Sequence, residues 1–125
     1  MKRKILIVDD EEYLRILLKD NLEIEGFEVI ATATGKEALE VAWKVLPDLA
    51  IIDIGLPDIN GWEVCQRLQQ DFRTADLPLV ILTAEASGKV TAQMKELGLK
   101  HYVPKPYHPI DIVGFLKKIL NISKT

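Results

Sequence analysis

The sequence predicts an α/β fold in which five parallel strands alternate with five helices. Three features indicate this: short apolar runs recur along the 125 residues, segments with helical apolar spacing lie between them, and turn or capping residues mark the boundaries. Strands that alternate with helices in one chain form a parallel sheet covered on both faces. Five strands are too few to close an eight-stranded barrel, so we expect an open, doubly wound sheet.

The expected strands are apolar runs without the polar alternation of a half-exposed sheet, which indicates burial on both faces. They are Ile5–Val8, Val29–Ala31, Leu49–Ile52, Leu79–Leu82 and a weaker His101–Val103. The (βα)₅ pattern favours a flavodoxin-like sheet with strand order 2-1-3-4-5. Ligands of such sheets bind beyond the carboxyl ends of the strands, near the reversal of strand order at strands 1 and 3.

The first helices are predicted from apolar stripes and from capping residues. One stripe ends before Gly26 and the next before Pro47, residues that commonly stop a helix. Thr34 and Glu37 have the spacing of a capping box at the start of the second helix, and Asn60 stands in a similar place before the third. The stripes are Leu14, Leu17, Leu18 and Leu22, and then Ala38, Leu39, Ala42 and Val45.

The last two helices are marked mainly by their ends. Ser87 is expected to cap the fourth helix and Gly98 to end it, and Pro109 suits the first turn of the fifth. Gly114, inside the fifth helix, costs about 1 kcal/mol relative to alanine. Its presence suggests close packing or slight mobility at that point.

Composition and charge exclude several classes of protein. With 16 basic and 19 acidic residues the formal net charge is −3, and no long basic run marks a surface for DNA or RNA. No stretch approaches the ~20 apolar residues of a membrane span, and the N-terminal apolar run is too short for a signal peptide. The single cysteine, Cys65, permits no intrachain disulfide and is expected to be a small buried hydrophobe. We therefore expect one cytoplasmic domain over residues 1–125, without direct contacts to nucleic acid or a membrane.

Acidic residues stand at the ends of two predicted strands. Asp9 and Asp10 follow the first strand and Asp53 follows the third, so three carboxylates are expected to meet at the carboxyl edge of the sheet. Two like charges about 4 Å apart repel by about 4 kcal/mol at an effective dielectric constant of 20, so protons or a cation must offset them. A hard cation with oxygen ligands fits this need, which indicates a Mg²⁺ site.

A hydroxyl and an ammonium join the carboxylates, because Thr83 ends the fourth strand and Lys105 follows the fifth. An ammonium, a hydroxyl and a metal ion around one carboxylate form a receptacle for the oxygens of a phosphoryl group. The remaining carboxylate is then a candidate nucleophile, as in aspartyl-phosphate chemistry.

Four segments that carry these residues resemble, in order and in register, the receiver domain of two-component signalling. They are LIVDDEE, D-I-G-L-P-D-I-N-G from Asp53 to Gly61, VILTA ending at Ala84, and Y-V-P-K-P from Tyr102 to Pro106. The second segment resembles the family motif D-x-x-[ML]-P-x-x-[DN]-G. The spacing between the segments fits the family without an insertion or deletion, and the resemblance covers essentially the whole chain.

The resemblance implies a chemical role for each acidic residue of the edge. Asp53 is the phospho-acceptor. Asp10 is a direct Mg²⁺ ligand, and Asp9 acts mainly through a bound water. The backbone carbonyl of Gly55 completes the metal ligands from the protein, and Lys105 pairs with the phosphate.

The resemblance also implies how the site is read and reset. Thr83 hydrogen-bonds a phosphoryl oxygen, and Tyr102 is similar to the switch aromatic of the family. The peptide between Lys105 and Pro106 is expected to be cis. Gly55 and Glu85 are expected to tune the access of water to the acyl phosphate, with Gly55 favouring a faster reset.

As a receiver, the chain is expected to take a phosphoryl group from a sensor histidine kinase or a histidine phosphotransfer protein. Phosphorylation is expected to alter the face of the fourth helix, fifth strand and fifth helix, which a downstream effector protein or domain reads. The chain is expected to be no enzyme in the ordinary sense, but a phospho-acceptor that assists its own phosphorylation and dephosphorylation. We expect a monomer or a weak, phosphorylation-dependent dimer.

Other functions fit the residues less well. A flavodoxin-like electron carrier needs a Ser/Thr/Gly-rich phosphate loop where this chain has acidic residues, and a haloacid-dehalogenase phosphatase needs an aspartate where Gly55 stands. A receiver-like scaffold that is never phosphorylated usually lacks a key residue, and none is missing here. The chain is also compatible with the excised regulatory domain of a longer transcription factor or output enzyme. His101, in place of an acidic residue before Tyr102, speaks against the dimer face of winged-helix transcription factors.

Overall fold

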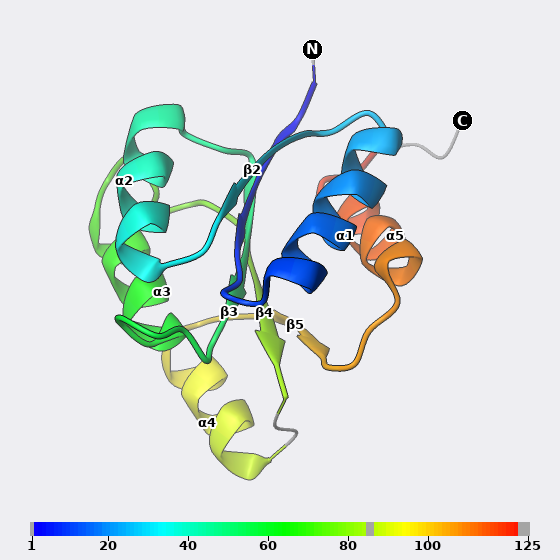
Figure 1. The fold of residues 1–125 in the computed structure, drawn as a ribbon. Helices are drawn as coiled ribbons and strands as arrows, with labels where there is room; N and C mark the ends of the chain where they lie inside the picture. Colours follow the sequence, from blue (N-terminus) through cyan, green and yellow to red (C-terminus); the bar gives the residue numbers. More distant parts are fainter. Residues whose placement is uncertain (1, 85–86, 123–125) are drawn as a thin grey trace.

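The computed structural model describes residues 2–84 and 87–122, in which a five-stranded parallel sheet lies between two layers of helices (Figure 1). The strands are β1 (Lys4–Val8), β2 (Glu28–Thr32), β3 (Leu49–Asp53), β4 (Leu79–Thr83) and β5 (His101–Pro104). The helices are α1 (Glu12–Ile24), α2 (Gly35–Val45), α3 (Gly61–Gln70), α4 (Gly88–Glu96) and α5 (Pro109–Ile119). The strand order is β2-β1-β3-β4-β5, which confirms the predicted topology.

Each face of the sheet has its own hydrophobic core. Side chains of successive strand residues point to opposite faces. In β1, Ile5 and Ile7 therefore pack with α1 and α5, whereas Leu6 and Val8 pack with α2, α3 and α4. All four side chains are fully buried, which explains why this strand is a continuous apolar run. Cys65, on α3, is buried in the second core as predicted, and burial raises the pKa of its thiol to about 12.

The capping residues define most helix starts as predicted. The Thr34 hydroxyl accepts a hydrogen bond from the Glu37 backbone N–H at 3.2 Å, and the Asn60 side chain accepts one from Glu63 at 3.1 Å. Ser87 is the N-cap of α4 by position, but its side chain makes no capping hydrogen bond. The prediction for Ser87 is therefore right about the boundary and wrong about the bond.

Left-handed residues close two helices at the predicted glycines. Gly26 follows α1 with φ +94° and Gly98 follows α4 with φ +69°, a region that favours glycine because it has no Cβ. α2 ends at Val45, and Leu46, between this helix and Pro47, is its C-cap in the left-handed conformation, with φ 54°. Among residues 2–84 and 87–122, no helix is both long and apolar enough to cross a lipid bilayer.

Packing does not explain why a glycine stands inside α5. A Cβ built on Gly114 meets no atom within 4 Å, and its φ lies outside the left-handed region, so close packing does not account for this residue. Gly98 has equally open surroundings but a positive φ. The two positions therefore separate the effect of space from the effect of backbone conformation.

We expect Gly114→Ala to stabilise the protein by about 0.5–1 kcal/mol, because alanine restricts the unfolded chain and fits the helix without a clash. Gly98→Ala should destabilise it, because the left-handed conformation strains a residue with a Cβ. Urea unfolding of both variants beside the parent protein measures the two changes. A loss of stability in Gly114→Ala would contradict the expected absence of strain at this site.

Candidate functional site

The candidate site lies where four strands end. Asp53 is the last residue of β3 and Thr83 the last of β4, while Asp9 follows β1 directly and Lys105 follows β5. The parallel register pairs Asp53 with Leu82 and the next residue, Thr83, with Pro104, so successive strands bring their final residues to one edge. The topology alone therefore gathers these four side chains, which are up to 96 positions apart in the chain.

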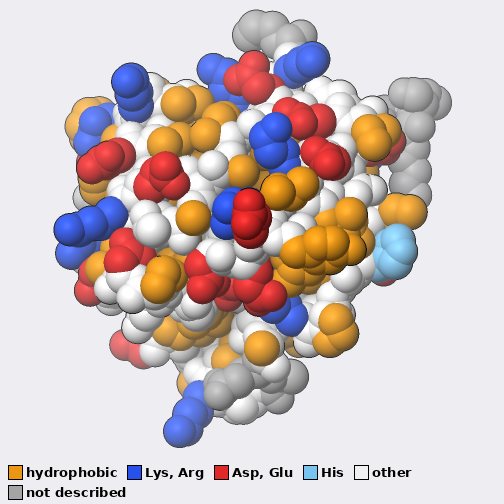
Figure 2. Space-filling model, in the orientation of Figure 1, with side chains coloured by type: hydrophobic (Ala, Val, Ile, Leu, Met, Phe, Trp, Pro, Cys, Tyr) orange, Lys and Arg blue, Asp and Glu red, His pale blue; other side chains and the backbone are white. Residues whose placement is uncertain are grey.

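Three carboxylates cluster at this edge. Asp9, Asp10 and Asp53 each have a carboxylate oxygen within 4.8 Å of the others. Asp9 and Asp53 are buried, with 1% and 6% of their surfaces exposed, whereas Asp10 is exposed. Acidic side chains are visible in Figure 2 around the point where β1 leads into α1. The cluster therefore has two buried members and one that faces solvent.

Lys105 provides the compensating charge. Its Nζ donates to Asp53 Oδ2 at 2.6 Å and to Glu11 Oε1 at 3.1 Å, and it lies 3.8 Å from Asp9 Oδ2. Burial lowers the pKa of Lys105, but the hydrogen bond and charge of Asp53, with Asp9 and Glu11, outweigh it and hold that pKa above its ordinary value. Lys105 therefore stays an ammonium between three carboxylates.

The backbone and one arginine orient Asp9. The Asp9 Oδ1 atom accepts a hydrogen bond from the Glu11 backbone N–H at 2.9 Å. The backbone carbonyl of Asp9 accepts one from Arg15 Nη1 at 2.8 Å. Burial raises the pKa of the Asp9 carboxyl to about 6, with the Asp53 charge adding to the rise and Glu11 and Lys105 opposing it. Ionisation of Asp9 therefore lowers the stability of the metal-free protein.

The donor set fits a hard divalent cation. Asp9 Oδ2 is buried and has no hydrogen-bond partner among the residues that the structure describes, so it offers an unused oxygen beside two further carboxylates. Mg²⁺ is bound by few carboxylates and retains several waters, which suits a cluster with one exposed member. Asp9, Asp10 and Asp53 could hold such an ion, and Asp10, Asp53 and Gly55 line one cavity.

Hydrogen bonds at Asp58 and close packing at Gly61 hold the loop between β3 and α3 in place. Asp58 accepts from the backbone N–H groups of Gly35 and Lys36 at 2.9 Å, so it caps the start of α2 from a distance. These bonds lower the pKa of Asp58 to about 2. At the other end of the loop, a Cβ on Gly61 would lie 2.5 Å from Ile54 Cα and 2.6 Å from the Asp53 carbonyl oxygen. Glycine therefore allows α3 to begin against the end of β3.

A cavity of about 510 Å³ opens onto these groups. Its lining includes both carboxylate and apolar side chains, among them Trp62 from α3 and Val90 from α4. Gly55 contributes no side chain, and a Cβ there would lie 3.8 Å from Asp53 Oδ1, an ordinary contact. A molecule that reacts with Asp53 would therefore enter through a pocket whose width depends in part on residue 55.

The remaining predicted residues lie at different distances from the carboxylates. Thr83 is 4% exposed and lines the cavity with Asp53 and Lys105. Tyr102 does not line it; its side chain is 49% exposed and borders a separate groove between α4 and β5. The Lys105–Pro106 peptide is cis, as expected. Glu85 lies outside the described residues.

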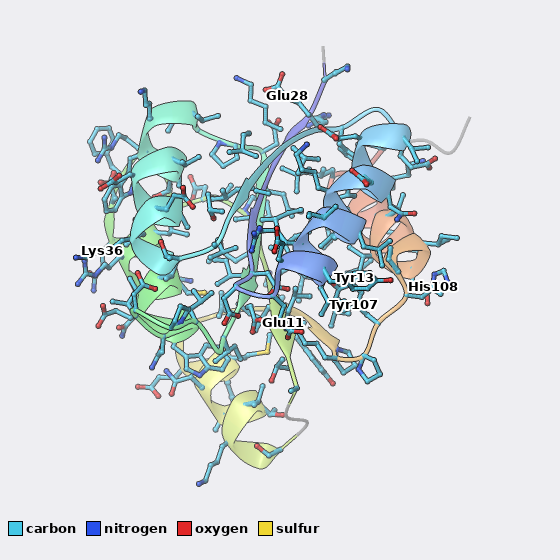
Figure 3. The ribbon with its side chains drawn as sticks, viewed as in Figure 1. Glu11, Tyr13, Glu28, Lys36, Tyr107 and His108 are labelled. Atoms are coloured by element: carbon cyan, nitrogen blue, oxygen red, sulfur yellow. The ribbon has the colours of Figure 1, made fainter. Side chains whose placement is uncertain are left out.

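Three residues of the site had no role assigned to them from the sequence. Glu11 binds Lys105 from 94 positions away, Tyr107 has a buried hydroxyl whose pKa is affected by the charges of Asp9 and Lys105, and Asp58 caps α2 across the fold. Glu11 and Tyr107 are labelled in Figure 3, both near the start of α1. Only Glu11 gave a usable signal, because it follows two residues that were already assigned to the edge.

The family comparison matches residues 5–117 to the response regulator receiver domain. The chain is similar to the alkaline phosphatase synthesis transcriptional regulatory protein PhoP of Bacillus subtilis (strain 168), at 40% identity over 99% of this chain and 51% of that protein. It is equally similar to the phosphate regulon transcriptional regulatory protein PhoB of Rhizobium meliloti (strain 1021), at 40% identity over 99% and 55%. The chain thus spans about half the length of these curated relatives.

Solved structures of receiver domains match nearly the whole chain. A CheY-like response regulator receiver domain protein from Methanospirillum hungatei JF-1 has a TM-score of 0.90 and 30% identity, covering 97% of this chain and 95% of that one. The receiver domain of HemR from Leptospira biflexa, in its non-phosphorylated form, has a TM-score of 0.87 and 31% identity, covering 99% and 98%. The residues matched to the family, 5–117, include every strand end that builds the site.

The raised pKa of Asp9 gives a pH-dependent prediction for stability. The unfolded carboxyl has a pKa of 3.8 and the folded one about 6, so Asp9 favours folding below about pH 4 and loses this contribution as pH rises to 6. We expect metal-free Asp9→Asn to melt about 3–6 °C above the parent at pH 8, with the difference shrinking toward pH 4.

Thermal unfolding of both proteins in EDTA from pH 4 to pH 8 checks this, and the difference between the two curves cancels the other titrating groups. Equal melting temperatures at pH 8, or a less stable variant there, would show that the ionised Asp9 carboxylate does not destabilise the folded protein. Asp10→Asn is a suitable control, because Asp10 is exposed.

Proposed function

The chain belongs to the response regulator receiver family, and from this premise we propose that it is a signalling switch that accepts a phosphoryl group on Asp53. The observation that carries the proposal is the contact between the buried Asp53 carboxylate and Lys105 at 2.6 Å, beside Asp9 and Asp10. A buried carboxylate held against an ammonium is a positioned nucleophile, and the adjacent cavity gives a phosphoryl donor access to it.

In the proposed reaction, an oxygen of Asp53 attacks the phosphorus of a phosphohistidine. The O–P bond forms as the P–N bond breaks, and the imidazole leaves with the electron pair. Because phosphoryl transfer needs mainly positioning and charge stabilisation, the protein contributes by orienting the carboxylate and offsetting charge on the equatorial oxygens. Lys105 is suited to the second task, since the pairing with Asp53 keeps it protonated.

Asp9, Asp10 and Asp53, with the carbonyl of Gly55, are the proposed ligands of a Mg²⁺ ion. When bound, the ion supplies positive charge that offsets the clustered carboxylates and the phosphoryl oxygens. Asp9 Oδ2, buried and without a partner among the described residues, supports this assignment.

Phosphorylation is proposed to reach a partner through Thr83 and Tyr102. A phosphoryl group adds about −1.5 to −2 charges and three acceptor oxygens, to which the Thr83 hydroxyl could donate. Tyr102 borders a groove of about 500 Å³ that Val90 and Met94 of α4 also line, so a shift at the end of β4 could change this groove. A full change of population needs about 5.5 kcal/mol of preference, which a few charge-assisted hydrogen bonds can supply.

Reset is proposed to occur by hydrolysis that the site itself assists. Gly55 leaves the approach to Asp53 open, since a side chain there would lie beside the Asp53 carboxylate. We therefore expect a short phosphoryl lifetime. The chain would then assist both its phosphorylation and its dephosphorylation without acting as an enzyme on other substrates.

The proposed partners are a sensor histidine kinase or a histidine phosphotransfer protein as donor, in the cytoplasm, and an effector protein or domain as target. The two curated relatives are transcriptional regulatory proteins about twice the matched length, which favours a second candidate, the regulatory half of a longer transcriptional regulator. The net charge of −3 still argues against direct contacts between these 125 residues and nucleic acid.

Incubation with acetyl phosphate and Mg²⁺ should add about 80 Da, one phosphoryl group, to the intact protein. Asp53→Asn should reduce this adduct to background, because the amide is no nucleophile. Intact-mass spectrometry measures both. A full adduct on Asp53→Asn, or none on the parent protein, would refute Asp53 as the acceptor.

Thr83→Ala should retain the phosphoryl adduct but weaken the response at the α4–β5 groove, because the proposed donor to the phosphate is lost. Hydrogen exchange with and without beryllofluoride should show a change around Tyr102 in the parent protein and less than half of it in the variant. Lys89→Ala, a substitution of an exposed α4 residue that does not line the groove, is the control for general effects on the helix. An unchanged response in Thr83→Ala would remove Thr83 as the coupling residue.

A further inference from the structure

The start of α2 holds the connection between β3 and α3, residues 54–60. Asp58 Oδ1 accepts a hydrogen bond from the Gly35 backbone N–H, and Asp58 Oδ2 accepts one from that of Lys36, each at 2.9 Å. These N–H groups belong to the first turn of α2, where a helix has no acceptors of its own and where its dipole favours a negative charge. In Figure 1 the first turn of α2 lies beside this connection, and Lys36 is labelled in Figure 3. Both carboxylate oxygens of Asp58 are therefore bound to a separate helix.

Apolar packing fixes the same contact independently of the hydrogen bonds. A Cβ built on Gly35 would overlap with Ile59 Cγ1 and would lie 2.9 Å from Val64 Cγ2. Glycine is required here for space, because its φ lies outside the left-handed region. Ile59 follows Asp58 directly and packs against the core under α2, α3 and α4. A carboxylate and an apolar side chain in adjacent positions therefore hold the connection to α2.

The same connection positions the proposed nucleophile. Asp53 Oδ1 accepts a hydrogen bond from the Gly55 backbone N–H at 3.0 Å, while Asp53 Oδ2 accepts one from Lys105 at 2.6 Å. Gly55 lies three positions before Asp58, and Pro57 between them has a fixed φ and restricts the residue before it. A displacement at Asp58 would thus pass to Gly55 instead of being absorbed between them. The orientation of the Asp53 carboxylate therefore depends on where the connection is held.

We propose that Asp58 is a positioning residue of this site, which holds the connection against α2 and so keeps the Gly55 N–H on the Asp53 carboxylate. It acts through the backbone of residues 54–57 and not on the reacting atoms. The inference rests on the proposed function only for its consequence, that Asp58 strengthens Mg²⁺ binding, since Asp53 and the Gly55 carbonyl are proposed ligands. Groups that orient a ligand from outside the metal shell typically contribute about 10- to 100-fold to affinity.

Thr34→Ala is the matched control for Asp58→Ala, because it removes a different cap from the same helix start. The Thr34 hydroxyl accepts a hydrogen bond from the Glu37 backbone N–H at 3.2 Å, three positions along the same segment. Each variant should lower the melting temperature by about 3–6 °C, because each leaves first-turn N–H groups without an acceptor. Only Asp58→Ala releases the connection between β3 and α3, so a difference between the two variants at the site reports on the connection and not on α2.

Amide hydrogen exchange of Gly55 in metal-free protein tests the inference directly. In EDTA, the Gly55 N–H of Asp58→Ala should exchange at least about 10-fold faster than in the parent protein, and that of Thr34→Ala less than about 2-fold faster, because local opening of the connection breaks the bond to Asp53. Two-dimensional NMR measures these rates residue by residue. Equal rates in Asp58→Ala and the parent, or the same acceleration in both variants, would overturn the proposal.

Asp58→Asn keeps the test decisive if the alanine variant does not stay folded. An asparagine side chain has one acceptor oxygen in place of two, so it can accept from only one of the Gly35 and Lys36 N–H groups. We expect Gly55 to exchange faster in Asp58→Asn than in Thr34→Ala, and an exchange rate equal to that of Thr34→Ala would overturn the proposal.

A Mg²⁺ titration followed by the fluorescence of Trp62, which lines the cavity, tests the consequence. Asp58→Ala should weaken binding about 10-fold and Thr34→Ala less than about 2-fold. If the parent protein neither binds Mg²⁺ nor gains the acetyl phosphate adduct, the proposed function fails, while the exchange of Gly55 still decides the role of Asp58. If the parent binds Mg²⁺ and Asp58→Ala binds it equally well, the inference about Asp58 fails and the proposed function stands.

Discussion

The ammonium of Lys105 holds this carboxyl edge together. It lies within 4 Å of carboxylates from Asp9, Glu11 and Asp53, which approach it from β1, the turn before α1, and β3. Without a cation here, the buried carboxylates would repel by several kcal/mol at the short distances observed. One lysine from the end of β5 thus makes it possible for three acidic segments to converge.

That compensation is incomplete, and its incompleteness is useful to a switch. One ammonium faces three carboxylates, and the pKa of Asp9 remains raised although Lys105 lowers it. A site with surplus negative charge binds a divalent cation readily, and the bound cation relieves the repulsion that folding left in place. The edge would therefore trade stability for affinity toward the proposed cation, while the two apolar cores on either side of the sheet stabilise the fold.

The sequence predicted the sheet well because its signal is local. Apolar runs on five strands and the caps at Thr34 and Asn60 depend on neighbouring residues, so they can be recognised without a structure. The convergence of Asp9, Asp53, Thr83 and Lys105 followed from the topology together with the family resemblance. The contacts of Asp58 with α2 and of Glu11 with Lys105 could not be predicted, because they join residues 22 to 94 positions apart and depend on where side chains point. The open surroundings of Gly114 escaped for the same reason, since composition says nothing about what lies beside a Cβ.

The site also lies where the two cores meet, which bears on how a change at Asp53 could spread. Trp62 and Val90, from the cavity wall, pack with the core under α2, α3 and α4. Tyr107, on the other side, packs with the core under α1 and α5. Because close-packed interiors transmit displacement rather than absorb it, a new charge between these side chains would act on both helical layers. The α4–β5 groove, which Val90 also lines, is then a surface that could respond to a change at Asp53.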